Sequence, residues 1–458
     1  MNPRRAAIFG FVLLPVVATL VLVGVMTALL LERGGTVSSV TVARQSSDAL
    51  AYAAEAGYAH ARTLLGTWGG CTDPADLPNT PLGTYTYSAA MTLGATTPGS
   101  TFWFTAVADS WLKSADDNAN FGSDTNLRNK KKSNDHRQTI VRFDLTSLPA
   151  NLDIVTATLH LYVTSRDGTG NPVEIYWIDS AWIENWASWD FEGNDYDDHL
   201  LHGSFTPSTE GYFSANLTRL VRKWVSGAVP NYGMRFISTS NDNESVYASR
   251  ETATTAQRPR LEVVTRAKRL VDIDASARDS AGVERALAGT VTGPAAGLLF
   301  LDYFNAGYAG NDGSRSWSGN WQEIGESNGT GSGAVRVVSS STWCAYGNCL
   351  RIDADSLSTA GAWRELSLAG AASATLHLHT RRDGGNWTLQ VSGNGGTSWQ
   401  TLKSTGNGDD TNQVRDTFDI SAYAASNTRI RVTSSQFVSS GAEDVYIDDV
   451  EVEAVCGP

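Results

Sequence analysis

The sequence predicts a mainly β protein, with an N-terminal transmembrane helix followed by two β-sandwich domains. Three observations support this fold class. One long apolar segment lies near the N-terminus, and beyond it the chain is rich in the Gly, Ser and Thr of short strands and tight turns. Alternating polar and apolar residues then recur along the chain. The 458 residues also exceed the roughly 250 to 300 that one core accommodates, so several compact units are expected.

Residues 6–31 carry no charge. As a helix this segment would be about 39 Å long, enough to cross a hydrocarbon layer of about 30 Å. It predicts a single-pass membrane protein, and Arg4 and Arg5 weakly favour a cytoplasmic N-terminus with the later domains outside. A cleaved secretory signal is the alternative, although the segment is long for one and no Ala-x-Ala site follows it.

The helix is expected to continue to about Leu65. Small and apolar residues recur every three, four or seven positions, as one helix face requires: Val37, Val40, Ala43, Leu50, Ala54, Ala61 and Leu64.

The basic start, the apolar helix and the sequence AAEAGY at 53–58 resemble the N-terminus of PilX-type minor pilins over residues 1–65. The resemblance implies other pilin-like subunits as partners and a place on a pilus. Gly10 and Phe11 are similar to the cleavage junction of type IV prepilins, but Pro15 stands where major pilins carry Glu. An uncut membrane anchor is therefore the alternative to a processed pilin.

Two segments, 66–100 and 266–296, are expected to form either a small pilin-like sheet or linkers. Residues 83–91 alternate like a half-buried strand, and residues 270–277 and 283–291 flank a turn at 279–282. If these strands pair, the region between them is an insertion in one sheet.

Residues 101–265 contain FWFTAVADSWL at 102–112, RQTIVRFDL at 137–145, SAWIE at 180–184 and SRE at 249–251. In this order they resemble DNRLRE-type domains, which are related to carbohydrate-binding modules and disaggregatase repeats. The resemblance implies a jelly-roll β-sandwich that attaches to polysaccharide.

Four tryptophans lie close together in this region, at 177, 182, 186 and 189. A flat aromatic ring can hold the apolar side of a sugar while polar neighbours bind its hydroxyls. Trp182 and Trp189 match the family pattern and are expected in the core, whereas Trp186 matches no such position. Trp186 is therefore the candidate for an exposed binding ring.

Three polar residues complete the candidate ligand site. Asp190 begins an acidic stretch that ends at Asp198. The carboxylates of this stretch would accept hydrogen bonds from sugar hydroxyls, bind calcium, or only form a solvated loop. Arg250 and Glu251 have two interpretations: recognition of uronate carboxylates or sugar hydroxyls, or a structural ion pair.

Residues 297–458 resemble the MAM-like jelly-roll accessory domains of secreted bacterial proteins, with strands predicted at 300–304 and 445–452. In such sandwiches the first and last strands are adjacent, which would bring Asp302 near Asp448 or Asp449. Calcium is the one cofactor that the sequence suggests, held by these carboxylates. The alternative is that they are strand-end caps.

The four cysteines stand at 71, 344, 349 and 456. Because Gly347 and Asn348 permit a tight turn, Cys344 and Cys349 are expected to form a disulfide, with Cα atoms within about 7 Å. The pairing of Cys71 and Cys456 stays open. Free thiols in a reducing compartment are the alternative.

The net charge and the absence of catalytic motifs limit the classes of function that the sequence supports. A net charge of −13 argues against nucleic acid as a partner. No Gly-x-Ser-x-Gly, His-Glu-x-x-His or phosphate-loop motif is present, so no enzyme is indicated. We expect a membrane-anchored or pilus-associated surface protein that binds extracellular polysaccharide or glycans in adhesion. The alternatives are a glycan-degrading enzyme of the disaggregatase kind and a purely structural surface protein.

Overall fold

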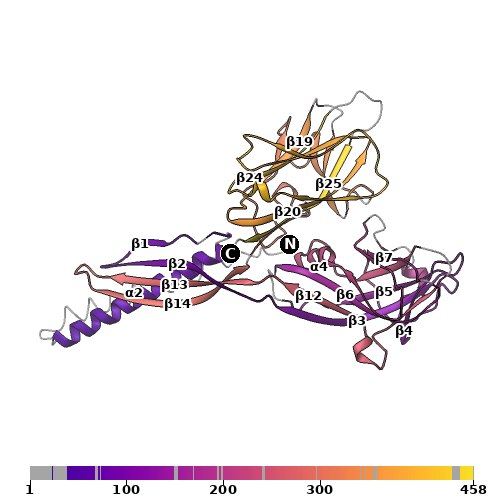
Figure 1. The fold of residues 1–458 in the computed structure, drawn as a ribbon, viewed down its shortest axis with the longest axis horizontal. Coiled ribbons are helices and arrows are strands. Elements are labelled where there is room, and N and C mark those ends of the chain that lie inside the picture. Colours follow the sequence, from indigo (N-terminus) through magenta and orange to yellow (C-terminus); the bar gives the residue numbers. More distant parts are fainter. Residues whose placement is uncertain are drawn as a thin grey trace, which may run out of the picture. The chain divides into compact units, whose positions relative to one another are not determined.

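The computed structural model describes Val23 and residues 39–456, apart from 68–70, 73, 149–152, 169, 193–194, 197–199, 240–242, 296, 341, 346, 354–356, 358 and 436–443. Apart from Val23, the predicted transmembrane segment 6–31 lies outside these residues. Among the helices of the described part, none has the length and apolar character needed to cross a membrane. The fold is mainly β, as predicted, and the chain divides into two units (Figure 1).

The first unit packs one long helix against a four-stranded antiparallel sheet. Its elements are α2 (Ser39–Thr67), β1 (Leu77–Leu82), β2 (Tyr85–Thr97), β13 (Lys268–Arg278) and β14 (Glu284–Ala295), with strand order β1-β2-β13-β14. Because β2 pairs with β13, the segments 66–100 and 266–296 form one sheet rather than linkers.

The helix buries the face that its periodicity indicates, with one correction. Leu50, Ala54 and Ala61 are buried against the sheet, as predicted. Leu64 is 38% exposed, and Leu65 is buried in its place. Leu65 lies four residues after Ala61, which keeps it on the buried face of a helix with 3.6 residues per turn.

The second unit contains two sandwiches. The first, here called the middle sandwich, has the sheet order β4-β11-β6-β12-β3-β5-β10-β7-β8, with β9 paired to β6. Its elements are β3 (Thr101–Lys113), β4 (Asn126–Asn129), β5 (Arg137–Phe143), β6 (Ile154–Arg166), β7 (Val173–Trp177), α3 (Trp189–Glu192), β8 (Gly203–Phe205), β9 (Gly211–Asn216), α4 (Thr218–Ser226), β10 (Met234–Ser238), β11 (Ser245–Ala248), η1 (Thr255–Gln257) and β12 (Arg260–Thr265).

Strand β3 belongs to both sheets of this sandwich. Its first half pairs with β12 and its second half with β5, and the register shifts between Ala106 and Ala108. Beyond the shift, strict alternation ends and residues 108–112 are all buried. This is why an aspartate in that run, Asp109, lies inside the protein.

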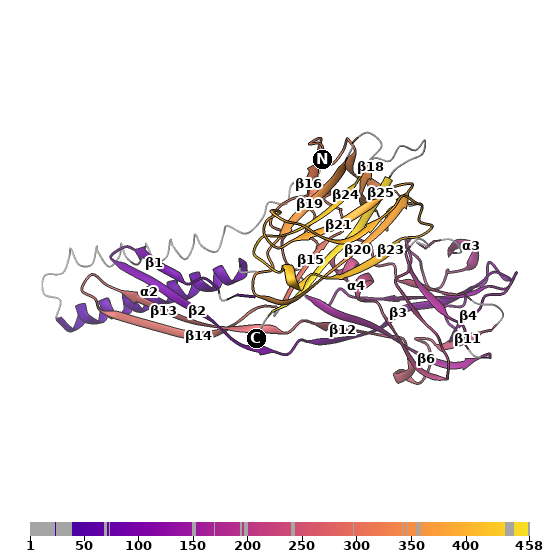
Figure 2. The same ribbon diagram turned by 45° about the horizontal axis from the view of Figure 1, so that its top comes forward.

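The C-terminal sandwich has a six-stranded sheet, β17-β18-β25-β20-β23 with β15 on β25, and a five-stranded sheet, β16-β19-β24-β21-β22 (Figure 2). Its elements are β15 (Gly297–Asp302), η2 (Gly307–Ala309), β16 (Gln322–Ile324), β17 (Val335–Ser339), β18 (Asn348–Asp353), β19 (Ala360–Leu366), β20 (Ala371–Asp383), β21 (Trp387–Ser392), β22 (Gln400–Thr405), β23 (Val414–Asp419), η3 (Ser421–Tyr423), β24 (Thr428–Ser434) and β25 (Asp444–Cys456). The first strand pairs with the last, as predicted.

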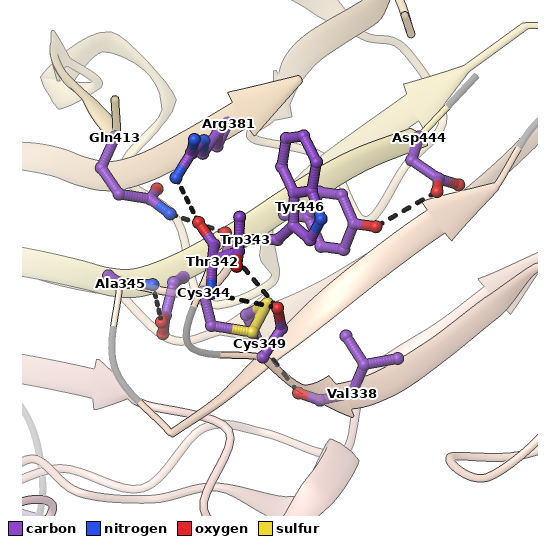
Figure 3. Close-up of a disulfide and its surroundings, with 12 residues drawn as sticks. Val338, Thr342, Trp343, Cys344, Ala345, Cys349, Arg381, Gln413, Asp444 and Tyr446 are labelled. Atoms are coloured by element: carbon purple, nitrogen blue, oxygen red, sulfur yellow. Dashed lines mark hydrogen bonds between the residues drawn. A yellow bond between two sulfur atoms is a disulfide. The ribbon is translucent and has the colours of Figure 1, made fainter. Parts of the chain in front are cut away.

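Both cysteine pairs are joined. Cys344 and Cys349 form the predicted disulfide with their Cα atoms 5.3 Å apart, and Cys71 is joined to Cys456. Around the first of these bonds, the ring of Trp343 stacks on Tyr446 with centroids 5.2 Å apart (Figure 3). The turn is therefore fixed by a stacked aromatic pair as well as by the covalent bond.

Candidate functional site

The tryptophan-rich loop after β7 has one buried and one exposed ring at its centre. Trp182 is 3% exposed, and its ring N–H donates a hydrogen bond to the carbonyl of Tyr232 at 2.7 Å. Trp186 is 74% exposed, on a short turn in which its N–H and that of Ala187 both donate to the Ile183 carbonyl. The predicted burial of Trp182 and exposure of Trp186 are confirmed, and the ligand contact of Trp186 stays a prediction.

Trp186 does not stand alone on this loop. Ile183 and Phe191 are also more than half exposed, and we call these three side chains the loop platform. Asp190, the predicted polar neighbour, is exposed on α3, and its backbone N–H donates to the carbonyl of Asp117. The loop therefore offers apolar surface and a solvated carboxylate within a few residues.

Arg250 and Glu251 lie beside the same loop, because Arg250 contacts Glu184 and a carboxylate oxygen of Glu251 lies within 4.8 Å of one of Glu184. One Arg250 guanidinium nitrogen is 2.7 Å from Glu184 Oε2 and 3.1 Å from Glu251 Oε1. The ion pair between Arg250 and Glu251 that the sequence allowed is thus present, and the contact between Arg250 and Glu184 links the loop to the chain after β11. About a third of the Arg250 side chain remains exposed.

Asp109 completes a group of three carboxylates that we call the acidic cluster: Asp109, Glu184 and Glu251. One oxygen from each lies within 4.8 Å of the other two. The N–H of Asp109 donates to Glu184 Oε1, and the N–H of Arg250 donates to Asp109 Oδ2, both at 2.8 Å. Sequence reasoning missed Asp109 and Glu184, although a charged residue within the apolar run 106–112 was a usable signal.

The electrostatics of Asp109 are unusual. Burial raises the pKa of Asp109 to about 8; the N–H of Arg250 opposes this effect, and the negative charge of Glu251 reinforces it. A carboxylate in such surroundings binds a proton or a cation more readily than an exposed one.

A pocket of about 690 Å³ opens where this loop begins, at Ala181. Polar side chains from two other segments line it, including Arg142 and Asp144 from one and Asn231 and Tyr232 from the other. The Arg142 guanidinium lies over the ring of Trp182, 5.2 Å from its centroid. Local sequence patterns did not indicate this pocket, because its walls come together only through strand pairing.

A second aromatic surface lies on the outer face of β3, β6 and β9. Trp103 is half exposed, with its ring 5.2 Å from that of His160, and Tyr162 lies 5.0 Å from Tyr212. His160 Nε2 is 3.1 Å from a carboxylate oxygen of Glu262. Sequence analysis missed this surface because its rings come from strands far apart in the chain.

The three aspartates of the predicted calcium site each have their own partners. Asp302 is buried and pairs with the guanidinium of Arg364; it also accepts hydrogen bonds from the Trp321 ring N–H at 2.7 Å and the Phe304 N–H at 2.8 Å. Asp448 accepts from the Ala345 N–H at 3.0 Å.

Asp449 pairs instead with Lys223 of α4, at 2.6 Å, and lies 3.2 Å from His379 Nδ1. His379 Nε2 is 2.6 Å from a nitrogen of Arg219. Burial alone would raise the pKa of Asp449, but Lys223 and His379 hold it well below its usual range. Among the described residues, the only group of three or more side chains suited to a metal is the acidic cluster, so calcium at 302, 448 and 449 stays a prediction.

Residues 100–265 match the model of carbohydrate-binding module family 96, which places that family's pattern on the middle sandwich. A comparison with curated proteins found no match.

Three solved structures illustrate the structural similarities. The tandem of two family 22 carbohydrate-binding modules of Xyn10C from Paenibacillus barcinonensis is 11% identical, covering 85% of this chain and 99% of that one, with a TM-score of 0.26. The C-terminal family 22 module of Xyn10B from Clostridium thermocellum is 15% identical over 34% of this chain and 94% of that one, with a TM-score of 0.23. TmCBM61, solved in complex with beta-1,4-galactotriose, is 18% identical over 29% and 86%, also with 0.23.

Proposed function

We propose that this protein is a surface protein, anchored in the membrane or associated with a pilus, whose middle sandwich binds extracellular polysaccharide in adhesion. The match of residues 100–265 to a carbohydrate-binding module family carries this proposal. The predicted apolar segment 6–31 and the pilin-like N-terminus support the anchor and the pilus association, and the packing of α2 on a four-stranded sheet is compatible with both.

The loop platform supplies the chemistry that sugar binding needs. The exposed ring of Trp186 stacks on the apolar face of a sugar, and the exposed ring of Phe191 on the same loop is a second aromatic surface. The exposed carboxylate of Asp190 accepts hydrogen bonds from sugar hydroxyls. The partly exposed guanidinium of Arg250 donates to hydroxyls or to a uronate carboxylate. A neutral or acidic polysaccharide therefore fits this surface.

A glycan array with the full-length protein in detergent micelles tests the proposal. We expect binding to a restricted set of polysaccharides, with no new reducing or unsaturated ends after long incubation. The appearance of new ends would contradict a purely adhesive function and favour the alternative, a glycan-degrading enzyme. Binding to no glycan would favour the purely structural alternative.

The location is tested by sequencing the N-terminus of the protein recovered from envelope and sheared-filament fractions. Recovery from filaments with an N-terminus at Phe11 would support pilus assembly. An intact N-terminus confined to the envelope would support a simple single-pass anchor.

A further inference from the structure

We propose that Asp109, Glu184 and Glu251 bind one divalent cation, with calcium as the occupant. The three carboxylates converge from three separate parts of the middle sandwich: strand β3, the loop after β7 and the segment after β11. One oxygen from each lies within 4.8 Å of the others, close enough for a single ion to contact all three.

Two unpaired oxygens give a second and independent reason. Asp109 Oδ1 and Glu251 Oε2 are buried, and within the described part of the chain neither has a hydrogen-bond partner. The whole Asp109 side chain is 1% exposed. Buried carboxylate oxygens are normally paired, because an unpaired one loses its hydration without compensation. A cation that contacts both oxygens would compensate for this loss.

The charge balance favours a cation. The cluster has three carboxylates and one guanidinium, that of Arg250. The guanidinium contacts Glu184 and Glu251, whereas Asp109 accepts a hydrogen bond from the backbone N–H of Arg250. A divalent ion would offset the excess negative charge.

The ligand chemistry favours calcium over other metals. All three side chains offer oxygen, and no His or Cys belongs to the cluster, whereas zinc sites use mainly nitrogen and sulfur. Magnesium demands near-ideal octahedral geometry, while calcium accepts irregular sets of carboxylates and carbonyls.

The cation would also fix the loop platform. Glu184 lies between Ile183 and Trp186, so an ion that holds Glu184 against β3 orders the turn that presents the exposed ring. This coupling to sugar binding rests on the proposed function. Binding of the ion does not.

The test uses the full-length protein, stripped with a chelator and titrated with calcium chloride by calorimetry. We expect the parent to bind one more calcium ion per chain than the cluster variants, with a rise in melting temperature. Asp109→Asn and Glu251→Gln should both lose the binding and the rise. Asp109→Asn keeps a side-chain oxygen that accepts from the Arg250 N–H, so this variant should fold. Glu210→Gln, at an exposed position of the same sandwich, is the matched control and should bind as the parent does.

Two results would overturn the inference. If the stripped parent binds no calcium, the cluster holds a shared proton instead. If Asp109→Asn still binds with parental affinity, the ion sits elsewhere. If both cluster variants lose calcium binding, the site is supported even when no glycan binds to the protein. The experiment therefore distinguishes a failure of the proposed glycan binding from a failure of the calcium site.

Discussion

Replacing the two central tryptophans of the loop after β7 should have opposite effects. Trp182→Ala removes a ring that is 3% exposed, which costs about 3 to 5 kcal/mol in the free energy of unfolding. It also leaves the Tyr232 carbonyl without the ring N–H that it accepts at 2.7 Å, which places the loss toward the upper end of that range. For a domain of this size, the melting temperature should fall by about 6 to 20 °C.

Trp186→Ala removes a ring that is 74% exposed, so the free energy of unfolding should change by no more than about 0.5 kcal/mol. Glycan affinity should fall at least about tenfold, the equivalent of about 1.4 kcal/mol, because the ring is the largest apolar surface of the loop platform. Trp186→Phe keeps a flat ring and should retain most of the affinity.

Scanning calorimetry and glycan titration of the full-length variants measure the two effects. A fall of several degrees in the melting temperature of Trp186→Ala, or an affinity equal to that of the parent, would refute the assignment of this ring to binding. A Trp182→Ala variant as stable as the parent would refute the packing argument.

Three further predictions concern the second unit. Lys223→Met leaves Asp449 buried without its ion-pair partner and should cost about 3 to 5 kcal/mol in urea unfolding, whereas adding Asp449→Asn should recover most of the loss; no recovery would contradict this account. Burial lowers the pKa of His379 to about 3, so the folded protein binds fewer protons than the unfolded chain below about pH 6.5; stability should fall as the pH decreases from 6.5 toward 3, and His379→Asn should flatten the melting curve against pH. The bond between Cys71 and Cys456 should be reduced before the disulfide of Figure 3, because Cys456 is only partly buried; mass spectrometry after brief thiol treatment and alkylation measures the order.

The predictions that the structure confirmed depend on patterns among residues close together in the sequence. The recurrence of Leu50, Ala54 and Ala61 follows from the 3.6-residue period of a helix, and the alternation around the turn at 279–282 follows from the two-residue period of a strand. The Cys344–Cys349 bond spans only five positions, so the geometry of one turn decides it. The exposed ring of Trp186 was recognisable because the family pattern accounted for its neighbours.

The amino-acid sequence by itself determined the mainly β fold, the helix face, one disulfide, the burial of Trp182 and the exposure of Trp186, because each depends on residues close together in the chain. Trp189, which was also expected in the core, is only partly buried. Only the tertiary structure decided the rest. Glu184 and Arg250 both form hydrogen bonds with Asp109, although they lie 75 and 141 positions from it in the sequence. Such contacts depend on strand order and on the register shift in β3, which local periodicity does not specify. The same reason explains why the ion-pair partners of Asp302 and Asp449, which are Arg364 and Lys223, could not be predicted from local patterns.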